Sequence, residues 1–304
     1  MQDASSNAAP WTVARLLDWT RQHFQRQGIE SPRLCAEILL AHALGCPRIQ
    51  LYARFEFVPD AGAMTVFRDA VREAGGGKPI AYLTGAKEFF SLSFDVTPDV
   101  LIPRPETEMI VERAIDWVRR SGQVDAAIVD IGTGSGCIAV ALAKHLPAAR
   151  LFASDMSETA LAVARRNANK HGVAGRVEFR CGSLFGPWTG DGAPPAFNVV
   201  VSNPPYIAER GADTVARSVR EFEPRTALFA GDDGLSIIRP LVAEAPRRIA
   251  PGGLFLMEIA YNQAAAVREL FSDAVWKSVA LHRDTAGHLR VVQAHTHDAA
   301  QGGS

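Results

Sequence analysis

The residues best suited to chemistry are four consecutive ones, Asn203, Pro204, Pro205 and Tyr206, which follow an apolar run over 197–202. Two consecutive prolines fix two φ angles and remove two backbone donors, so this turn presents mainly acceptors and an aromatic ring. The side-chain oxygen of Asn203 and the carbonyl oxygen of Pro204 can each accept one hydrogen of a planar –NH2 group, while Tyr206 packs against its plane. The turn is therefore predicted to bind a substrate amide or amino group.

Such an –NH2 group is a poor nucleophile because its lone pair is delocalised into a carbonyl or an aromatic ring. Two acceptors that draw its hydrogens out of the plane favour a pyramidal nitrogen and direct its lone pair at an electrophilic carbon. Catalysis would then consist mainly of positioning for in-line displacement, for which effective molarities of about 10⁵–10⁸ M are attainable. On this hypothesis Asn203, Pro204 and Tyr206 are catalytic and Pro205 completes the substrate-binding turn. The alternative is a surface turn in which Asn203 makes only a local hydrogen bond.

A second motif leads from a buried strand containing Asp130 through Gly132-Thr133-Gly134-Ser135-Gly136 into a helix. Ligands of α/β sheets bind beyond the carboxyl ends of the strands, where glycines let the backbone approach closely. The spacing is GxGxG and departs from the GxGxxG of dinucleotide-binding loops. Asp155 follows the next predicted strand, where a carboxylate can accept hydrogen bonds from both ribose hydroxyls. This combination predicts a nucleoside cofactor without pyrophosphate, S-adenosyl-L-methionine. Alternatively, the glycines only pack strand against helix and Asp155 only caps the helix that follows.

The elements expected to position these motifs alternate between strand and helix after Gly122. Strands are predicted at 127–131, 150–154, 177–180, 198–202, 253–259, 275–281 and 289–294, and helices at 135–145, 158–171, 235–249 and 263–271. This alternation is typical of an α/β fold whose mostly parallel sheet is covered on both faces. The turn near Gly287 is too short for a crossover helix, so the last strand should be antiparallel to its predecessor.

The region before the sheet has helical periodicity. One predicted helix starts near Val13 and ends at Gly28, a second begins with Ser31 as its N-cap and Pro32 at its first position, and a third is capped by Asp60. Short alternating runs between 86 and 103 indicate a β-hairpin. We therefore predict a helical domain over 1–85, a hairpin linker over 86–104 and a catalytic domain over 105–304.

The composition excludes several classes of protein. The 32 Lys and Arg residues balance 33 Asp and Glu residues, so no global positive charge attracts nucleic acid or anionic lipid. The four cysteines lack metal-ligand spacing, which disfavours a zinc site or a disulfide framework. The most apolar stretch, 126–143, is interrupted by Asp130 and three glycines, and the first residues lack the pattern of a signal peptide. The expectation is a cytoplasmic protein without a metal, without stable nucleic-acid binding and without a membrane segment.

Together these residues resemble the class I S-adenosylmethionine-dependent methyltransferases, specifically the HemK-type enzymes that methylate a glutamine side-chain amide in peptide chain release factors. The likeness extends from Trp11 to Ala294. The segments that carry it are GAKEFFSLSF (85–94), VLIPRPETE (100–108), DIGTGSGCIAVA (130–141), NPPYI (203–207) and EPRTALFAGDDGL (223–235). The resemblance implies a Rossmann-like seven-stranded methyltransferase sheet with an antiparallel last strand, preceded by a small all-helical domain.

The resemblance also implies roles for individual positions. The glycine segment would hold the methionine arm of the cofactor, Asp155 the ribose, and positions 183–184 the adenine. The full set of implied cofactor contacts is Asp130, Gly132, Thr133, Gly134, Ser135, Gly136, Asp155, Ser183, Leu184 and Asn203. The family usually has aspartate at the position of Ser183, so hydrogen bonding on the adenine side is expected to differ here. The implied substrate is the glutamine of the Gly-Gly-Gln motif in class 1 release factors, bound by 203–206. The resemblance also implies that the helical domain over 1–85 helps to dock these factors.

Three alternative functions remain open from the residues. A DNA or RNA adenine methyltransferase would present the same donor pair after base flipping, although the near-neutral charge disfavours it. A related enzyme that methylates a glutamine of a ribosomal protein is closer, and the PRPETE segment favours the release-factor branch. A catalytically silent nucleoside sensor would not need the intact Asn203 and Tyr206. The roles of four charged residues near the expected site stay unassigned: Arg104, Glu106, Glu223 and Glu258.

Overall fold

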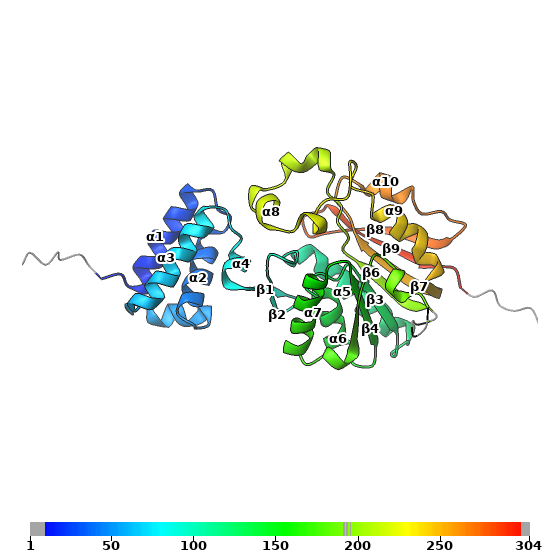
Figure 1. Cartoon of the computed structure of the whole chain (residues 1–304), viewed down its shortest axis with the longest axis horizontal. Helices are drawn as coiled ribbons and strands as arrows, with labels where there is room; N and C mark the ends of the chain where they lie inside the picture. The colour runs from blue at the N-terminus through cyan, green and yellow to red at the C-terminus, as the bar shows by residue number, and fades with distance from the viewer. Residues whose placement is uncertain (1–9, 191, 193, 195, 299–304) are drawn as a thin grey trace, which may run out of the picture. The chain divides into compact units, whose positions relative to one another are not determined.

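The computed structural model describes residues 10–298 except 191, 193 and 195 (Figure 1). These residues form two compact units. One unit comprises the chain up to Gly85 together with 217–222, and we call it the helical unit. The other comprises 86–216 and the chain from Glu223 onward, and we call it the catalytic unit.

The helical unit is built from short helices around one apolar core. Its elements are α1 (Val13–Arg26), α2 (Pro32–Ala43), the 3-10 helix η1 (Arg48–Arg54), α3 (Ala61–Gly75), α4 (Ile80–Thr84) and α8 (Arg217–Phe222). The carboxylate of Asp60 caps α3 by accepting a hydrogen bond of 2.8 Å from the Ala63 amide. Ser31 precedes α2 with a φ of 48° and makes no side-chain capping bond. The predicted positions are therefore confirmed, with Ser31 at the N-cap and Pro32 at the start of α2, but the Ser31 hydroxyl does not cap the helix.

The catalytic unit contains a seven-stranded sheet, as the sequence predicts. Its strands are β3 (Ala127–Ile131), β4 (Arg150–Asp155), β5 (Val177–Cys181), β6 (Phe197–Ser202), β7 (Ile249–Glu258), β8 (Trp276–Arg283) and β9 (Leu289–Thr296). They are arranged in the order β5-β4-β3-β6-β7-β9-β8, and β9 is antiparallel to both of its neighbours. All five residues of β3 are buried, as expected for a parallel strand covered on both faces. The strand order reverses between β3 and β6, and ligands bind at such a switch point in open α/β sheets.

Helices cover both faces of this sheet. Those of the catalytic unit are α5 (Glu108–Ser121), α6 (Cys137–His145), α7 (Glu158–Lys170), α9 (Ile238–Glu244) and α10 (Ala264–Arg268). Side chains of α5, α6 and α7 belong to the apolar cluster on one face, and those of α9 and α10 to the cluster on the other. The helix predicted over 235–249 is too long, because α9 ends at Glu244 and a 3-10 turn containing Pro246 follows. Proline lacks the amide hydrogen that would continue the α-helix.

The β-hairpin belongs to the catalytic unit. Its strands β1 (Ala86–Phe89) and β2 (Leu92–Asp95) pair antiparallel, and the side chains of Phe89 and Phe94 are buried in the core. The buried Asn167 of α7 joins this hairpin to the loop between β3 and α6. Its carboxamide exchanges hydrogen bonds with the backbone of Asp95, at 2.7 and 3.0 Å, and donates one of 2.8 Å to the Ser135 carbonyl oxygen.

Within the described part of the chain, no single helix is long and apolar enough to span a bilayer. The bent pair of α2 and η1 passes such a test on length and composition alone.

Candidate active site

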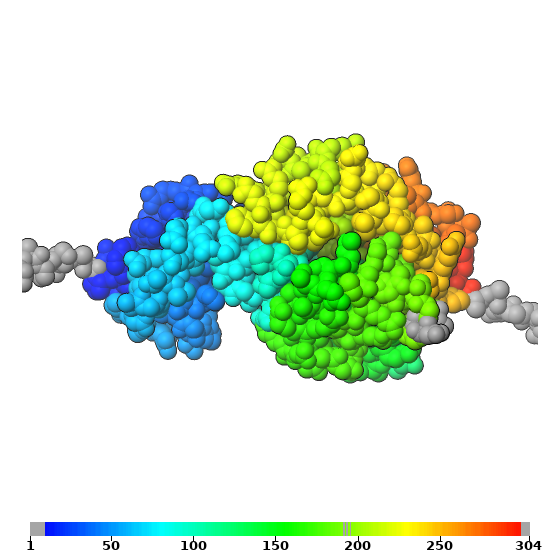
Figure 2. All heavy atoms as spheres, viewed as in Figure 1, coloured from blue at the N-terminus to red at the C-terminus, as the bar shows by residue number. Residues whose placement is uncertain are grey.

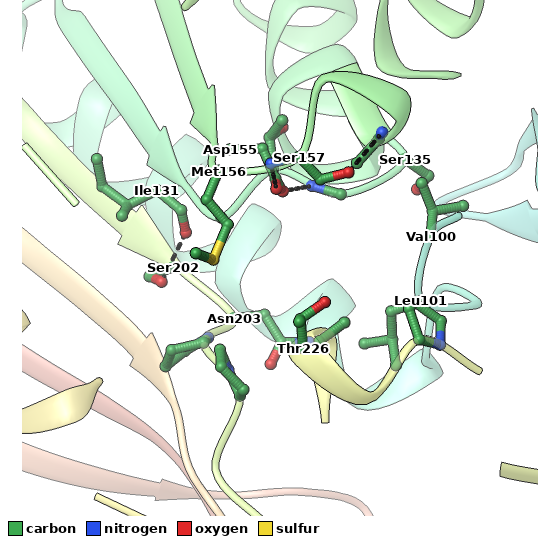
Figure 3. A pocket seen from close by; sticks show the side chains of 18 of the residues that line it. Val100, Leu101, Ile131, Ser135, Asp155, Met156, Ser157, Ser202, Asn203 and Thr226 are labelled. Carbon is green, nitrogen blue, oxygen red and sulfur yellow. Dashed lines mark hydrogen bonds between the residues drawn. The ribbon is translucent and has the colours of Figure 1, made fainter. Parts of the chain in front are cut away.

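A cavity of about 290 Å³ opens where β3, β4 and β6 end. Figure 2 shows the surface hollowed where the green part of the catalytic unit meets its yellow segment. In Figure 3, Asp155 and Met156 line one side of this cavity, and Asn203 and Thr226 the opposite side. Among the described residues, no cluster of three or more His, Cys, Asp or Glu side chains could hold a metal ion.

The three glycines of the loop between β3 and α6 have two different surroundings. All have positive φ, namely 74° at Gly132, 54° at Gly134 and 80° at Gly136. Gly132 and Gly134 line the cavity, and a Cβ on either would meet open space. Gly136 does not line the cavity, and a Cβ there would lie 3.0 Å from the Ala164 Cβ. Two glycines therefore leave room at the cavity, while the third allows α6 to pack against α7.

Asp155, the last residue of β4, lines the cavity and also ties two loops together. Its Oδ2 accepts a hydrogen bond of 2.9 Å from the Gly134 amide, and its Oδ1 accepts one of 2.9 Å from the Ser157 amide. Burial raises the pKa of the Asp155 carboxyl. The side chain thus fixes the glycine loop against the turn before α7. The cap of α7 is Ser157, whose Oγ accepts a hydrogen bond of 3.1 Å from the Ala160 amide, so the alternative in which Asp155 only caps this helix is wrong.

The remaining predicted cofactor residues fall into two groups. Thr133, Ser135, Ser183 and Leu184 line the cavity. Ser135 Oγ is buried and has no hydrogen-bond partner within the described residues. Asp130 is fully buried beneath the loop, where its Oδ2 accepts a hydrogen bond of 2.6 Å from the Thr133 hydroxyl. Burial raises the pKa of Asp130 to about 7.

The Asn-Pro-Pro-Tyr turn follows β6 at the same edge of the sheet. Ser202 Oγ donates a hydrogen bond of 2.7 Å to the Ile131 carbonyl oxygen, which joins the ends of β6 and β3 (Figure 3). Asn203, Pro204 and Pro205 line the cavity. The structure thus brings the predicted substrate turn and the glycine loop to one cavity.

Tyr206, unlike the three residues before it, does not line the cavity. Its ring packs against an apolar cluster of the sheet, and its hydroxyl donates a hydrogen bond of 3.0 Å to Glu258 Oε1. Burial, together with the neighbouring Glu258 carboxylate, raises the pKa of Tyr206 far above its usual range. A neutral phenol in this place anchors the turn and cannot act as a base.

Glu258, at the end of β7, connects Tyr206 to a third side chain. Thr107 Oγ1 donates a hydrogen bond of 2.6 Å to Glu258 Oε2 and accepts one of 3.1 Å from Asn203 Nδ2. Thr107 and Glu258 are 2% and 1% exposed, so water does not compete for these bonds. Burial raises the pKa of Glu258, and its two hydroxyl donors and Arg290 oppose that rise. Four side chains therefore form one network that anchors the substrate turn, with Thr107 and Glu258 buried and Asn203 and Tyr206 partly buried.

Comparison with known proteins identifies the family. A model of the PrmC N-terminal domain matches residues 15–85, and one of the methyltransferase small domain matches 118–222. The release factor glutamine methyltransferase of Rhodopirellula baltica is 45% identical over 293 residues, which cover 95% of this chain and 97% of that protein. The enzyme of the same name from Geobacter sulfurreducens is 43% identical and covers 93% and 96%. The chain belongs to the release factor glutamine methyltransferase family.

The fold of this chain is also similar to that of solved methyltransferase structures. The catalytic domain of hMettl16 matches with a TM-score of 0.53 and 17% identity, over 73% of this chain and 81% of that one. A methyltransferase from Pyrococcus furiosus matches with a TM-score of 0.50 and 18% identity, over 76% and 98%. At such identities the likeness shows a shared sheet and helix arrangement only.

A partly buried ion pair between Arg104 and Glu223 joins two segments of the cavity wall. Glu223 binds the Arg104 guanidinium with one carboxylate oxygen and accepts a hydrogen bond of 3.0 Å from the Ile102 amide with the other. This contact connects the segments 99–103 and 224–229, both of which contribute to the cavity wall. Glu106, the remaining unassigned residue, does not line the cavity.

Sequence reasoning missed Thr107 and Asn167, both of which hold functional segments in place. Thr107 lies 151 positions before Glu258 and 96 before Asn203, and Asn167 lies 72 after Asp95. The only signal for Thr107 was its place within the PRPETE segment that carries the family resemblance, and Asn167 lies in none of the segments that carry it. Side chains whose partners are this distant leave no periodic pattern.

Proposed function

We propose that this protein transfers a methyl group from S-adenosyl-L-methionine to the side-chain amide nitrogen of a glutamine in peptide chain release factors. The substrate we assign is the glutamine of the Gly-Gly-Gln motif in class 1 factors. The observation that carries the proposal is that Asn203 and Pro204 line the same cavity as Gly132, Gly134 and Asp155. The names of the curated relatives support the choice of substrate.

The cavity wall fits the methyl donor. S-adenosyl-L-methionine supplies an electrophilic methyl group on a sulfonium. Gly132 and Gly134 leave open space for its methionine arm, and the unpaired hydroxyl of Ser135 offers a hydrogen bond there. Asp155 would bind the ribose hydroxyls, with Ser183 and Leu184 on the adenine side. Asp130 and Gly136 support the loop from behind, as their buried contacts indicate.

The substrate turn would prepare the amide nitrogen for attack. Asn203 Nδ2 is bound to Thr107, so its Oδ1 is the end that can accept a hydrogen from the glutamine amide. The Pro204 carbonyl oxygen would accept the second hydrogen. Withdrawing both hydrogens from the amide plane frees the lone pair, and the two acceptors stabilise the positive charge that develops on nitrogen. A strong base is not required before attack, because nitrogen becomes acidic only after it gains the methyl group.

The helical unit is proposed to dock the release factor, in line with its match to the PrmC N-terminal domain. We further propose a cytoplasmic location, which the translational role of the substrate supports. The four cysteines are unpaired in the structure, as expected in a reducing compartment. The net charge of −1 supports the absence of stable binding to nucleic acid or to membranes.

The test is methylation of a full-length class 1 release factor, followed by intact mass and peptide mapping. One methyl group on the Gly-Gly-Gln glutamine is expected, and none on a release factor with asparagine at that position. Asn203→Ala should lower kcat about 10²–10³-fold, the effect of removing one transition-state contact, while cofactor affinity stays within about twofold. The exposed Asn169→Ala is the matched control. Methylation of an adenine oligonucleotide in place of the release factor, or a parental rate for Asn203→Ala, would refute the proposal.

A further inference from the structure

The carboxamide of Asn203 has two ends of nearly identical shape and opposite chemistry. Its oxygen accepts hydrogen bonds, whereas its NH2 group only donates them. Only the oxygen can hold a hydrogen of a substrate amide. Rotation of the side chain by 180° would present a donor to a donor, so the function of Asn203 depends on which end faces the cavity.

The network behind Asn203 determines that choice. Glu258 accepts a hydrogen bond at each carboxyl oxygen, from the Tyr206 hydroxyl at Oε1 and from the Thr107 hydroxyl at Oε2, 2.6 Å away, so the single hydroxyl hydrogen of Thr107 is directed at Glu258. Thr107 Oγ1 then has only lone pairs to offer in the direction of Asn203. The NH2 end of Asn203 satisfies these lone pairs at 3.1 Å, and the Asn203 oxygen must lie on the other side.

Three features make this arrangement rigid. The partner atoms come from three separate elements, namely the 3-10 turn η2 (Pro105–Thr107), the end of β7 and the turn after β6. Both Thr107 and Glu258 are almost fully buried, and in such a site an unsatisfied polar group is costly. The second oxygen of Glu258 accepts the Tyr206 hydroxyl at 3.0 Å, which ties the far end of the same turn to the same carboxylate.

We propose that Thr107 and Glu258 are positioning residues that fix the polarity of the Asn203 carboxamide, so that its oxygen faces the substrate amide. This inference rests on the proposed function, in which Asn203 accepts a hydrogen of the glutamine NH2 group. Thr107 lines the cavity and Glu258 does not, and we assign neither of them a contact with a reacting atom. Both act by excluding the flipped carboxamide.

The test compares Thr107→Val with Thr107→Ser. Valine keeps the shape and removes the hydroxyl, so Asn203 loses its acceptor and both orientations become available. We expect kcat to fall about 10–100-fold, with cofactor Kd and release-factor KM within about threefold, because the lost interaction matters mainly in the transition state. Serine keeps the hydroxyl and should retain kcat within about threefold of the parent.

A double-mutant cycle separates positioning from a merely structural role. In the Asn203→Ala background no carboxamide remains to be oriented, so adding Thr107→Val should change kcat less than about twofold. Effects of the two substitutions that multiply would overturn the proposal, as would parental kcat for Thr107→Val or equal losses for valine and serine. The folding of the variants is a separate control, for which Thr107→Ala provides a second hydroxyl-free variant. If both hydroxyl-free variants unfold at 25 °C, the hydroxyl has a structural role and the proposal is wrong. A parent enzyme that does not methylate the release factor refutes the proposed function instead.

Discussion

Replacing Asp130 with asparagine should change how the stability of the catalytic unit depends on pH. Burial raises the pKa of Asp130 from 3.8 to about 7, so between these values the native state holds a proton that the unfolded chain has released. Raising the pH through this window therefore lowers the free energy of unfolding, by about 1.4 kcal/mol per pH unit. From pH 5 to pH 8 the contribution of Asp130 falls by about 2–3 kcal/mol. Asparagine keeps the shape and removes the titration.

The measurement is urea-induced unfolding at pH 5, 6, 7 and 8 and constant ionic strength, without cofactor. Replacing Trp11 and Trp19 of the helical unit with phenylalanine in every variant leaves tryptophan fluorescence that reports on the catalytic unit, which contains the buried Trp188. The parent should lose its advantage over Asp130→Asn progressively up to about pH 7 and little beyond it. Asp125→Asn, at an exposed site shortly before β3, controls for the loss of a carboxyl group. A difference between parent and Asp130→Asn that stays constant within about 0.5 kcal/mol across this range would refute the reasoning from burial.

Two further predictions concern substitutions in the glycine loop and at Asn167, and their effects on the free energy of unfolding and on cofactor binding. Gly136→Ala should lower the free energy of unfolding by about 2 kcal/mol or more, because it combines a positive φ with a close approach to Ala164. Gly134→Ala should cost about 1 kcal/mol in stability and mainly weaken cofactor binding measured by calorimetry, since its Cβ meets open space at the cavity. Equal effects of the two substitutions on stability would contradict this division. Asn167→Leu should cost about 2–4 kcal/mol in urea unfolding through unsatisfied backbone groups, whereas the exposed Asn169→Leu on the same helix should cost less than about 0.5 kcal/mol.

The sequence predicts the strands well because each is a short apolar run bounded by turn residues. The predicted strand over 127–131 coincides with β3, and the antiparallel direction of β9 follows from the short turn near Gly287. The start of β7 at Ile249, four positions before the predicted strand, was missed. Ile249 pairs with Phe197 beside an irregularity in register, and a local pattern does not contain such a partner.

The candidate site was predictable where backbone conformation alone required a residue type. The glycine loop and the two prolines were found for that reason. The separate surroundings of Gly134 and Gly136 were not, because they depend on Ala164 in a different helix. The hydroxyl partner of Tyr206 was equally hidden, since Glu258 lies 52 positions further along the chain. Contacts between distant segments exist only once the sheet has formed.

The pairing of Ile131 with Ser202 places the donor-side loop and the acceptor-side turn on adjacent strands. Neighbouring strands are held about 4.8 Å apart by their backbone ladder, whatever side chains they carry. On the proposed function, the sheet itself would therefore hold the loop for the methyl donor and the turn for the nucleophile at a fixed separation.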